Sequence, residues 1–446
     1  MDWQKKYRHK LISPEEAAGL VKSGDRVVLA LSLKPREVAL AIARRASELR
    51  NVTIVSHWNE DYPWLHPGME DSFYVKEGFV LRPSRQPVRE KRVDWMPTIF
   101  GLHDGQRQAL SGRSPVYHFA DLFLVRLTPP SPQGYCSFGH ALWYSPTALR
   151  TAKIAIAQID PSLPYTLGES VSGEDIDYLV APGPAPEATT PPLPMPGPEE
   201  WERAQVIGAL ASDLVKDGDT IQIGIGTPSE AVMEFLGTKN DLGVYSELVF
   251  PRLIDLMREG VITGRKRSVD PGKVTTSCLW LYAEDPRAQP SLEFLDHNPA
   301  FDFRDISHIC HIPRIAANEN MTTINTALAI DLLGQAVIDH LGPVPMAGPG
   351  GQVEFCIGSH YSRGGRSITC LASTTQDGRT SRIVPQLEAG SVVQVPLTYI
   401  DFLATEHGVV NLDGKTRRER AEAIISVAHP DFQPELRRWA RQLFYP

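Results

Sequence analysis

Residues 221–248 read IQIGIGTPSEAVMEFLGTKNDLGVYSEL, and this stretch decides the fold. Its apolar start predicts a buried strand that runs into a glycine-containing turn, followed by a capped helix. A second short strand, LGVYS, then ends on a carboxylate, Glu247. This order of elements is typical of an open α/β sheet, which binds ligands at the carboxyl ends of its strands. The stretch therefore predicts an α/β fold whose ligand site holds an acid.

The first half of the chain contains a similar stretch. It reads LVKSGDRVVLALSLKPREVALAI, and the second half reads LVKDGDTIQIGIGTPSEAVMEFL. Each predicts a helix end, a Gly-Asp turn, an apolar strand, a turn and a helix, which favours a duplicated α/β unit over a chance likeness. Gly224 and Gly226 of the second copy correspond to Ala30 and Ser32 of the first. We therefore expect the ligand site mainly in the second half.

Chain length and proline content predict two domains. A chain of 446 residues is longer than one ordinary core accommodates. Residues 181–198 carry proline at roughly every second or third position, which indicates a stiff linker. We expect α/β domains at residues 1–185 and 200–446, joined by a linker at 186–199.

Charge and apolar runs argue against several classes of protein. The formal net charge is −8, whereas non-specific nucleic-acid binding needs a basic face. No run approaches the roughly 18 apolar residues that span a bilayer, and no apolar segment follows the basic start, so neither a membrane protein nor a signal peptide is expected. The five cysteines are scattered and form no CxxC motif, which indicates a reduced, cytoplasmic protein.

Two acids in the opening stretch are candidates for chemistry. Glu230 lies three residues after Thr227, the spacing of a capping box, so its expected role is to close a helix N-terminus. Glu247 lies at a strand end, where a carboxylate can be a nucleophile, a general base or a metal ligand. The alternative is an ordinary acid favoured by the dipole of the next helix, which Pro251 is expected to interrupt early.

A second glycine-rich turn, PMAGPGGQVEF, occupies residues 345–355. Its three glycines indicate either close approach of the backbone to a ligand or another loop, or a turn that needs positive φ. Gln352 could fix a carbonyl or an amide. Glu354, in a segment that we expect to be a strand, is a rival nucleophile.

The remaining charged and histidine-containing segments are expected to be structural. His308 and His311 have too few spaced companions for a zinc site, and alternation along a strand would point them to opposite faces. GRKR (264–267) and GKTRRER (414–420) are expected to be solvated faces, with one cation available to a phosphate of the ligand. We therefore expect no metal site.

Taken together, these segments resemble the acetyl-CoA hydrolase/transferase family, in particular its branch of 4-hydroxybutyrate and butyryl-CoA:acetate CoA-transferases. The similar segments of the first half are TPPSPQGYCSFG (128–139), AKIAIAQIDPSLPYTLGES (152–170) and DIDYLV (175–180). Those of the second half are IQIGIGTPSEAV, LGVYSELV, INTALAIDLLGQ (324–335), GPGGQVEF, SRIVPQL (381–387) and ATEHGVVNLDGKTRRERAEAIISVAHPDF (404–432).

The resemblance implies two related open α/β domains of the CoA-transferase type and a homodimer. It implies acyl-CoA and a small carboxylic acid as substrates, with no tightly bound cofactor. Its catalytic glutamate falls on Glu247. The residues that it assigns to the CoA and acyl site are Gly224, Ile225, Gly226, Thr227, Pro228, Ile324, Asn325, Gly348, Gly350, Gly351 and Gln352.

The chemistry that the resemblance implies begins with attack of Glu247 on the thioester carbonyl of an acyl-CoA, giving an acyl-glutamyl anhydride. CoA thiolate then attacks the Glu247 carbonyl, which frees the first acid and leaves a glutamyl-CoA thioester. A second acid reverses these steps, with ping-pong kinetics. An acyl-CoA hydrolase on the same scaffold and a catalytically silent acyl-CoA-binding protein are the alternatives.

Departures from the family pattern surround the expected acyl pocket. Pro228 stands where family members have a backbone N–H thought to serve the oxyanion, so either Thr227 or Ser229 supplies the donor or the oxyanion hole differs. Ala347 and Glu354 also replace the usual residues. The aromatic-rich segment 57–74 is expected to shape a pocket for an acid larger than acetate.

Overall fold

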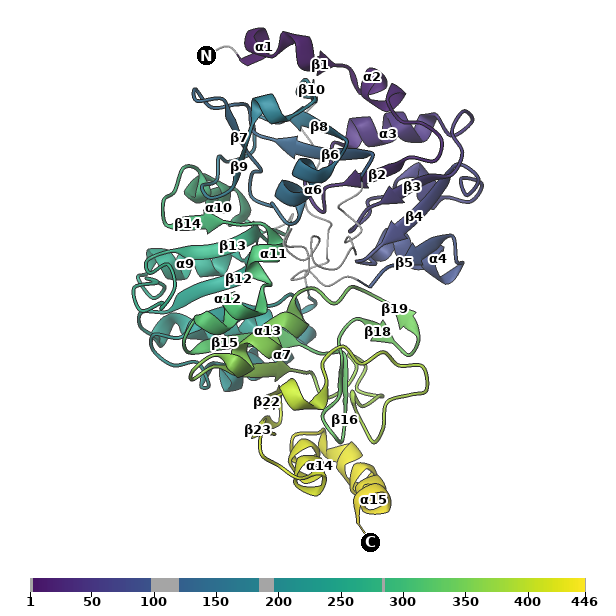
Figure 1. The fold of residues 1–446 in the computed structure, drawn as a ribbon. Coiled ribbons are helices and arrows are strands. Elements are labelled where there is room, and N and C mark those ends of the chain that lie inside the picture. Colours follow the sequence, from purple (N-terminus) through teal and green to yellow (C-terminus); the bar gives the residue numbers. More distant parts are fainter. Residues whose placement is uncertain (1–2, 98–119, 184–195, 283–284, 446) are drawn as a thin grey trace. The chain divides into compact units, whose positions relative to one another are not determined.

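The chain divides into two compact units, each described by itself below (Figure 1). The structure, a computed structural model, describes residues 3–97, 120–183, 196–282 and 285–445. The first unit comprises Met1–Leu193, Thr275–Ile309 and Met346–Gly348, and the second comprises Pro194–Val274, Cys310–Pro345 and Pro349–Pro446. Most of the expected linker at 186–199 lies outside the described residues, and its last two residues begin a helix, α7 (Pro198–Ser212). The expected domain boundaries stay a prediction.

The first unit is built on an eight-stranded sheet in which all neighbouring strands are parallel. In spatial order its strands are β1 (Leu11–Ile12), β10 (Tyr178–Val180), β8 (Ile154–Ile159), β6 (Leu122–Leu127), β2 (Arg26–Leu29), β3 (Val52–Val55), β4 (Phe73–Glu77) and β5 (Val93–Trp95). Helices α2 (Pro14–Gly19) and α3 (Arg36–Arg44) contribute Ala17, Val38 and Ile42 to its core. Parallel strands buried in this way are largely apolar, and the segments DLFLVRL (121–127) and KIAIAQI (153–159) have that composition.

The second unit contains a sheet of the same kind. Six of its strands lie in the order β12 (Gly243–Val249), β11 (Thr220–Ile223), β15 (Met321–Thr326), β20 (Arg366–Cys370), β22 (Phe402–Thr405) and β23 (Gly408–Asn411). All neighbours are parallel except β22 and β23, which form an antiparallel hairpin. The molecule is thus an α/β protein with two mainly parallel sheets, as the opening stretch predicted.

Helices and short segments surround these strands. The helices of the second unit include α7, α8 (Thr227–Glu230), α9 (Pro251–Arg258), α12 (Ile312–Ala317), α13 (Gln352–Tyr361), α14 (Arg417–Ser426) and α15 (Gln433–Phe444). Helices α14 and α15 pack on each other at the C-terminal end (Figure 1, yellow). Between residues 274 and 309 the chain forms β13 (Val274–Leu279), α10 (Ala288–Leu295), β14 (Phe301–Phe303) and α11 (Ile306–Ile309). The first unit also contains α4 (Arg82–Arg89) and α6 (Ser145–Thr151).

The Gly-Asp turns of the two similar stretches have the same geometry. Gly24 and Gly218 adopt φ values of 87° and 82°, which favour glycine. Asp25 and Asp219 follow, and each accepts the backbone N–H three residues upstream at 2.8 Å. In each sheet the strand after this turn pairs with the next strand along the chain. Shared turns and shared pairing support the duplication of one α/β unit.

Two capping motifs predicted helix starts correctly, whereas other sequence patterns predicted several secondary-structure elements wrongly. Ser13 with Glu16 and Thr416 with Glu419 have the spacing that predicts a capping box, and both boxes are formed. The helix interruption predicted at Pro251 is wrong, because this proline is the first residue of α9, where a missing N–H costs nothing. The strand predicted around Glu354 is wrong as well, since the residue lies in α13. His308 lies in α11 and His311 caps α12, so the alternation expected for a strand does not apply.

In the part of the chain that the structure describes, no helix is long and apolar enough to cross a membrane. All five cysteines are buried, and none of them forms a disulfide.

Candidate functional site

Glu247 lies at the carboxyl edge of the second unit's sheet. Strand β12 runs parallel to β11, with Gly243 opposite Thr220 and Val244 opposite Ile221. Continuing this register brings Glu247 level with Gly224, where β11 has ended. Strand β12 itself continues to Val249, two residues beyond the predicted end. The acid is therefore held by regular sheet structure at the edge where α/β proteins bind ligands.

The carboxyl group of Glu247 packs on the N-terminus of α13. Gly351 is the N-cap of this helix, and a methyl group on it would lie 2.7 Å from Cδ and 2.9 Å from Oε1 of Glu247. The same methyl group would lie 2.6 Å from Sγ of Cys310. Only glycine leaves room for both side chains, and the backbone N–H of Gly351 donates a hydrogen bond to Glu247. A helix N-terminus favours a negative charge at this position.

Burial opposes that preference. Glu247 is 7% exposed, and its pKa is raised to about 8, mainly by desolvation and to a lesser extent by the negative charge of Glu354. Hydrogen bonds from the Gly351 N–H and from the Cys310 thiol lower the pKa of Glu247 by a smaller amount. A buried carboxyl with an acidic neighbour and few donors gains little stabilisation on ionising. Groups with such a perturbed pKa are frequent at functional sites.

The glycines of the turn after β11 are explained by the neighbouring strand. A side chain at Gly224 would collide with the amide of Asn325, and one at Gly226 would lie 2.5 Å from Oγ1 of Thr326. Gly226 also adopts φ 139°, which disfavours any other residue. Asn325 exchanges two hydrogen bonds of 2.9 Å with Gln222, and both amides are buried. These glycines therefore let two strand ends come together, whatever ligand the turn receives.

Two further residues of the predicted CoA site act within the turn or the sheet. Ile324 is fully buried in β15, and its carbonyl accepts the N–H of Gly224 at 2.9 Å. Thr227 donates its hydroxyl to Glu200 of α7 at 2.8 Å. Ile225 lies between the two glycines and is partly exposed. Gly224, Ile225, Ile324 and Asn325 thus lie at one edge of the sheet.

The amide hydrogens around Pro228 are largely committed. Glu230 accepts the N–H of Gly226 at 3.0 Å, so it closes the helix as expected, although the N-cap is Gly226 and Thr227 lies inside the helix. The N–H of Ser229 donates to Oγ1 of Thr326 at 3.3 Å. Pro228 occupies the second position of α8 and has no N–H. Of the two donors considered for the oxyanion, Ser229 is therefore occupied and Thr227 is the better candidate.

The second glycine-rich turn uses its three glycines differently. Gly348, in the first unit, packs so closely on Phe79 that a methyl group would lie 2.8 Å from the ring. Gly350 adopts φ 58°, and Gly351 contacts Glu247 as described above. Gln352 is the first residue of α13, and its Nε2 is buried with no hydrogen-bond partner among the described residues. A buried amide donor without an acceptor is costly unless a ligand supplies one.

The sequence did not predict that Cys310 contacts Glu247. Nothing in the sequence distinguishes this cysteine from the other four, because its contact with Glu247 joins segments 63 residues apart. Two basic residues were also misassigned as solvated. Arg267 is buried over the ring of Tyr245, and Arg420 is buried and donates to the backbone carbonyls of Leu333, Leu397 and Leu412.

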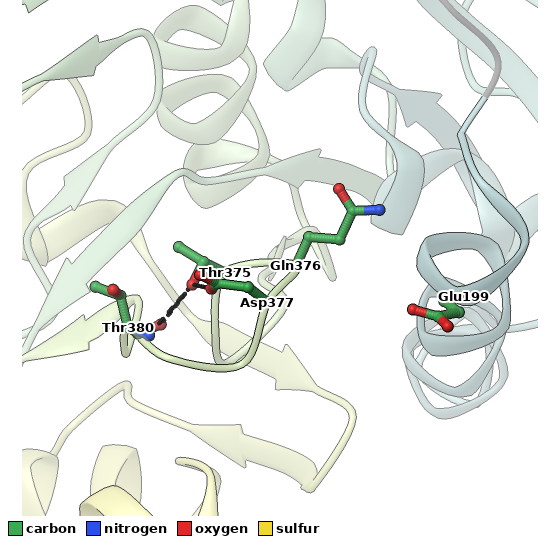
Figure 2. A pocket seen from close by; sticks show the side chains of 5 residues that line it. All are labelled: Glu199, Thr375, Gln376, Asp377 and Thr380. Carbon is green, nitrogen blue, oxygen red and sulfur yellow. Dashed lines mark hydrogen bonds between the residues drawn. The ribbon is translucent and has the colours of Figure 1, made fainter.

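A separate depression in the second unit lies between α7 and the loop at 375–380 (Figure 2). It encloses about 570 Å³ and is lined by Glu199, Thr375, Gln376, Asp377 and Thr380. Thr375 donates its hydroxyl to Asp377 at 2.6 Å. Its charged lining is acidic, which disfavours the phosphates of CoA. Within the described ranges, no group of three or more potential metal ligands occurs.

Family models match both ends of the chain. The acetyl-CoA hydrolase/transferase N-terminal domain matches residues 1–191, and the C-terminal domain of the same name matches residues 289–440.

Relatives match over nearly the whole length, and full-length relatives are CoA-transferases. The chain is 32% identical to 4-hydroxybutyrate coenzyme A transferase of Clostridium kluyveri, over 98% of each chain. It is 33% identical to succinyl-CoA:cyclohexane-1-carboxylate CoA transferase of Geobacter metallireducens, over 99% of this chain and 97% of the relative. The crystal structure of RipA from Yersinia pestis superposes with a TM-score of 0.87 at 28% identity and covers 100% of both chains. The chain therefore belongs to the acetyl-CoA hydrolase/transferase family.

Proposed function

We propose that the chain is a CoA-transferase that moves CoA between an acyl-CoA and a carboxylic acid, with Glu247 as the nucleophile. The observation that supports this most is the Glu247 carboxyl group, buried at the carboxyl edge of the sheet and packed on Gly351 at the N-terminus of α13. A carboxylate with few hydrogen-bond donors is poorly stabilised and therefore nucleophilic.

The proposed reaction has two covalent intermediates. Glu247 attacks the thioester carbonyl, the carbon–sulfur bond breaks, and CoA leaves as thiolate from an acyl-glutamyl anhydride. The thiolate then attacks the Glu247 carbonyl and releases the first acid, leaving a glutamyl-CoA thioester. A second carboxylate attacks this thioester and the steps run in reverse, so the kinetics are ping-pong.

Oxyanions form at each carbonyl that is attacked, and we propose that amide donors of the two glycine-containing turns hold them. Thr227 has a backbone N–H in the turn where Pro228 has none and the N–H of Ser229 already donates to Thr326. Gln352 adds an unpaired side-chain amide at the first position of α13. Preorganised donors in a buried site stabilise developing charge with little reorganisation. Acyl-CoA is a substrate here, and no tightly bound cofactor or metal is required.

The acid is proposed to be larger than acetate. In the first unit, Trp58 packs edge-to-face on Trp143 and on Trp280 at 5.0 Å each, and on Phe79 at 5.5 Å. Phe79 in turn contacts Gly348 of the glycine-rich turn. Trp58 and Trp143 both adopt φ 49°, a strained conformation that is frequent at functional sites. The named substrates of two relatives, 4-hydroxybutyrate and cyclohexane-1-carboxylate, are also larger than acetate.

A covalent-trapping experiment tests the nucleophile. Protein incubated with acyl-CoA and then with borohydride or hydroxylamine should lose activity, and peptide mass analysis should locate the modification on Glu247. Glu247→Gln should abolish both turnover and trapping. Glu354→Gln, at the rival acid of α13, should keep the adduct, so an adduct lost in Glu354→Gln and kept in Glu247→Gln would reassign the nucleophile.

An acceptor panel tests the reaction class. CoA transfer to acetate, hydroxybutyrate and ring-containing acids is measured beside release of free CoA thiol in the absence of acid. Transfer that exceeds thiol release supports a transferase, and thiol release that no acid accelerates supports the hydrolase. Equal turnover of acetate and bulky acids contradicts the proposed pocket, and no turnover with any acid or water supports a silent binding protein.

A further inference from the structure

Cys310 is a thiol that the proposed steps leave unused, yet it lies against the reacting carboxyl group. Its side chain is fully buried. A Cβ atom on Gly351 would lie 2.6 Å from Sγ of Cys310 and 2.9 Å from Oε1 of Glu247, so the two side chains meet at this glycine. The thiol also hydrogen-bonds the Glu247 carboxyl group. The proposed anhydride and thioester steps use the sulfur of CoA and do not require a thiol from the protein.

The position of Cys310 is fixed by helix packing. It precedes His311, the N-cap of α12, and α12 packs on α13. The two helices approach so closely at Gly358 that a methyl group on it would lie 2.5 Å from Cβ of Ile315. Because α13 carries Gly351 at its start, this packing holds the thiol and the helix N-terminus on the same carboxyl group. The contact is therefore built by two packed helices and a strand.

We propose that Cys310 is a positioning residue, whose S–H group holds the Glu247 carboxyl against Gly351 while donating only a weak hydrogen bond. This inference rests on the proposed function, in which Glu247 is the nucleophile. A thiol is a weak donor with a large, poorly hydrated sulfur atom. It fixes the orientation of the carboxylate without stabilising the charge as much as a hydroxyl would. The nucleophile stays both oriented and reactive.

Other groups around the carboxyl set the background for this effect. Glu354 faces it from α13 and disfavours its charge, while the N–H of Gly351 favours it. Tyr245 of β12 lies beside Cys310, and Arg267 covers the ring of Tyr245 at 5.6 Å. Replacing Cys310 changes one donor and leaves these groups in place. The acid limb of kcat/KM therefore reports on the thiol.

The test compares Cys310→Ala and Cys310→Ser across a pH series of kcat/KM. Loss of the donor in Cys310→Ala should move the acid limb up by about half a pH unit, because the ionised carboxylate loses a hydrogen bond. The stronger hydroxyl donor in Cys310→Ser should move the limb down and lower the plateau kcat. Cys370, buried in β20, provides the control, since Cys370→Ala and Cys370→Ser should change thermal stability and leave the limb in place.

An infrared measurement covers the case in which Cys310→Ala does not fold. The S–H stretch that disappears in Cys310→Ser should shift between about pH 6 and about pH 10 in the unmodified protein, but not in Glu247→Gln. An acid limb and a stretch that both stay in place would overturn the inference. If Glu247→Gln is inactive and the limb of Cys310→Ala is unmoved, only the role of Cys310 fails. If Glu247→Gln retains turnover, the proposed function itself fails.

Discussion

Glu247 is subject to two opposing influences that come from different parts of the chain. Burial and the negative charge of Glu354 raise the pKa of its carboxyl group. The N–H of Gly351 at the N-terminus of α13 and the thiol of Cys310 lower this pKa. The place of Glu247 near the carboxyl end of a strand was predictable from the sequence, because a polar residue after an apolar run suggests the end of a buried strand, although β12 continues to Val249. Cys310 and Glu354 were not predictable as its neighbours, since tertiary packing alone brings them there.

The ionisation of Glu247 should appear directly in the pH dependence of the reaction. Since burial raises the pKa of Glu247 to about 8 and attack requires the carboxylate, kcat/KM should rise with pH and level off above about 8. Initial rates measured over a pH series, with an acyl-CoA whose acyl group does not titrate, give this acid limb. A value of kcat/KM that is already constant from about pH 6 upwards would contradict a protonated resting state.

Gly351 should tolerate no side chain, although its backbone would permit one. It adopts φ −96°, so the effect of Gly351→Ala arises from contacts alone. The added methyl group would collide with Glu247 and Cys310, and displacing the nucleophile by about 1 Å should lower kcat about 100-fold. Gly19→Ala is the matched control, because a methyl group in α2 meets nothing within 4 Å. Near-normal kcat in Gly351→Ala would show that the carboxyl group can move without loss.

At the scale of elements, explicit chemical signals predicted more than apolar runs did. The two capping boxes could be read from a hydroxyl and a glutamate three residues apart. Helix α13 could not, because its N-cap is a glycine with no side chain to recognise, and it buries residues on several faces. A helix buried on several faces has no clear amphipathic period, so the segment around Glu354 looked like a strand. His308 and His311 were expected on a strand for another reason: α11 is a single turn and His311 precedes α12, so neither histidine lies in a helix long enough to show a helical period.

The capping box at Thr416 should stabilise the C-terminal helices by a measurable amount. Its hydroxyl accepts the N–H of Glu419, whose side chain accepts the N–H of Thr416 at 2.8 Å. Thr416→Ala removes the hydroxyl acceptor and should lower the free energy of unfolding by about 1 kcal/mol. Thr416→Ser keeps the acceptor and should have little effect. Equal stability of the alanine and serine variants in chemical denaturation would argue against this cap.

At the scale of the whole molecule, the sequence predicted the class of fold and its repetition. The shared Gly-Asp turn and strand order could be read from two similar stretches. The grouping of Thr275–Ile309 and Met346–Gly348 with the first unit could not. These segments follow the second stretch in the chain, and no local pattern of residues reports which core buries them. A proline-rich segment can divide the chain only into two continuous stretches, whereas the first unit is built from three separate ones.

The charge of Glu247 should also set the stability of the protein against pH. The pKa of Glu247 is raised in the folded state from 4.5 to about 8. The free energy of unfolding that depends on a neutral Glu247 is therefore fully present below about pH 4.5 and is lost as pH rises through about 8. Glu247→Gln has no proton to lose and should therefore be more stable than the unmodified protein above about pH 8, by a few kcal/mol.

Denaturant unfolding of both proteins at several pH values measures this difference. The gain should grow from about pH 5, level off above about pH 8 and be small in acid, because a neutral glutamine resembles a protonated glutamate. Glu202→Gln, at an exposed position of α7, controls for the general loss of a negative charge. Stability curves of Glu247→Gln and the unmodified protein that run parallel at all pH values would mean that the buried carboxyl ionises without strain. A gain that grows from about pH 5 and levels off above about pH 8 would mean that the fold gives up stability to keep a reactive carboxylate at the carboxyl edge of its sheet.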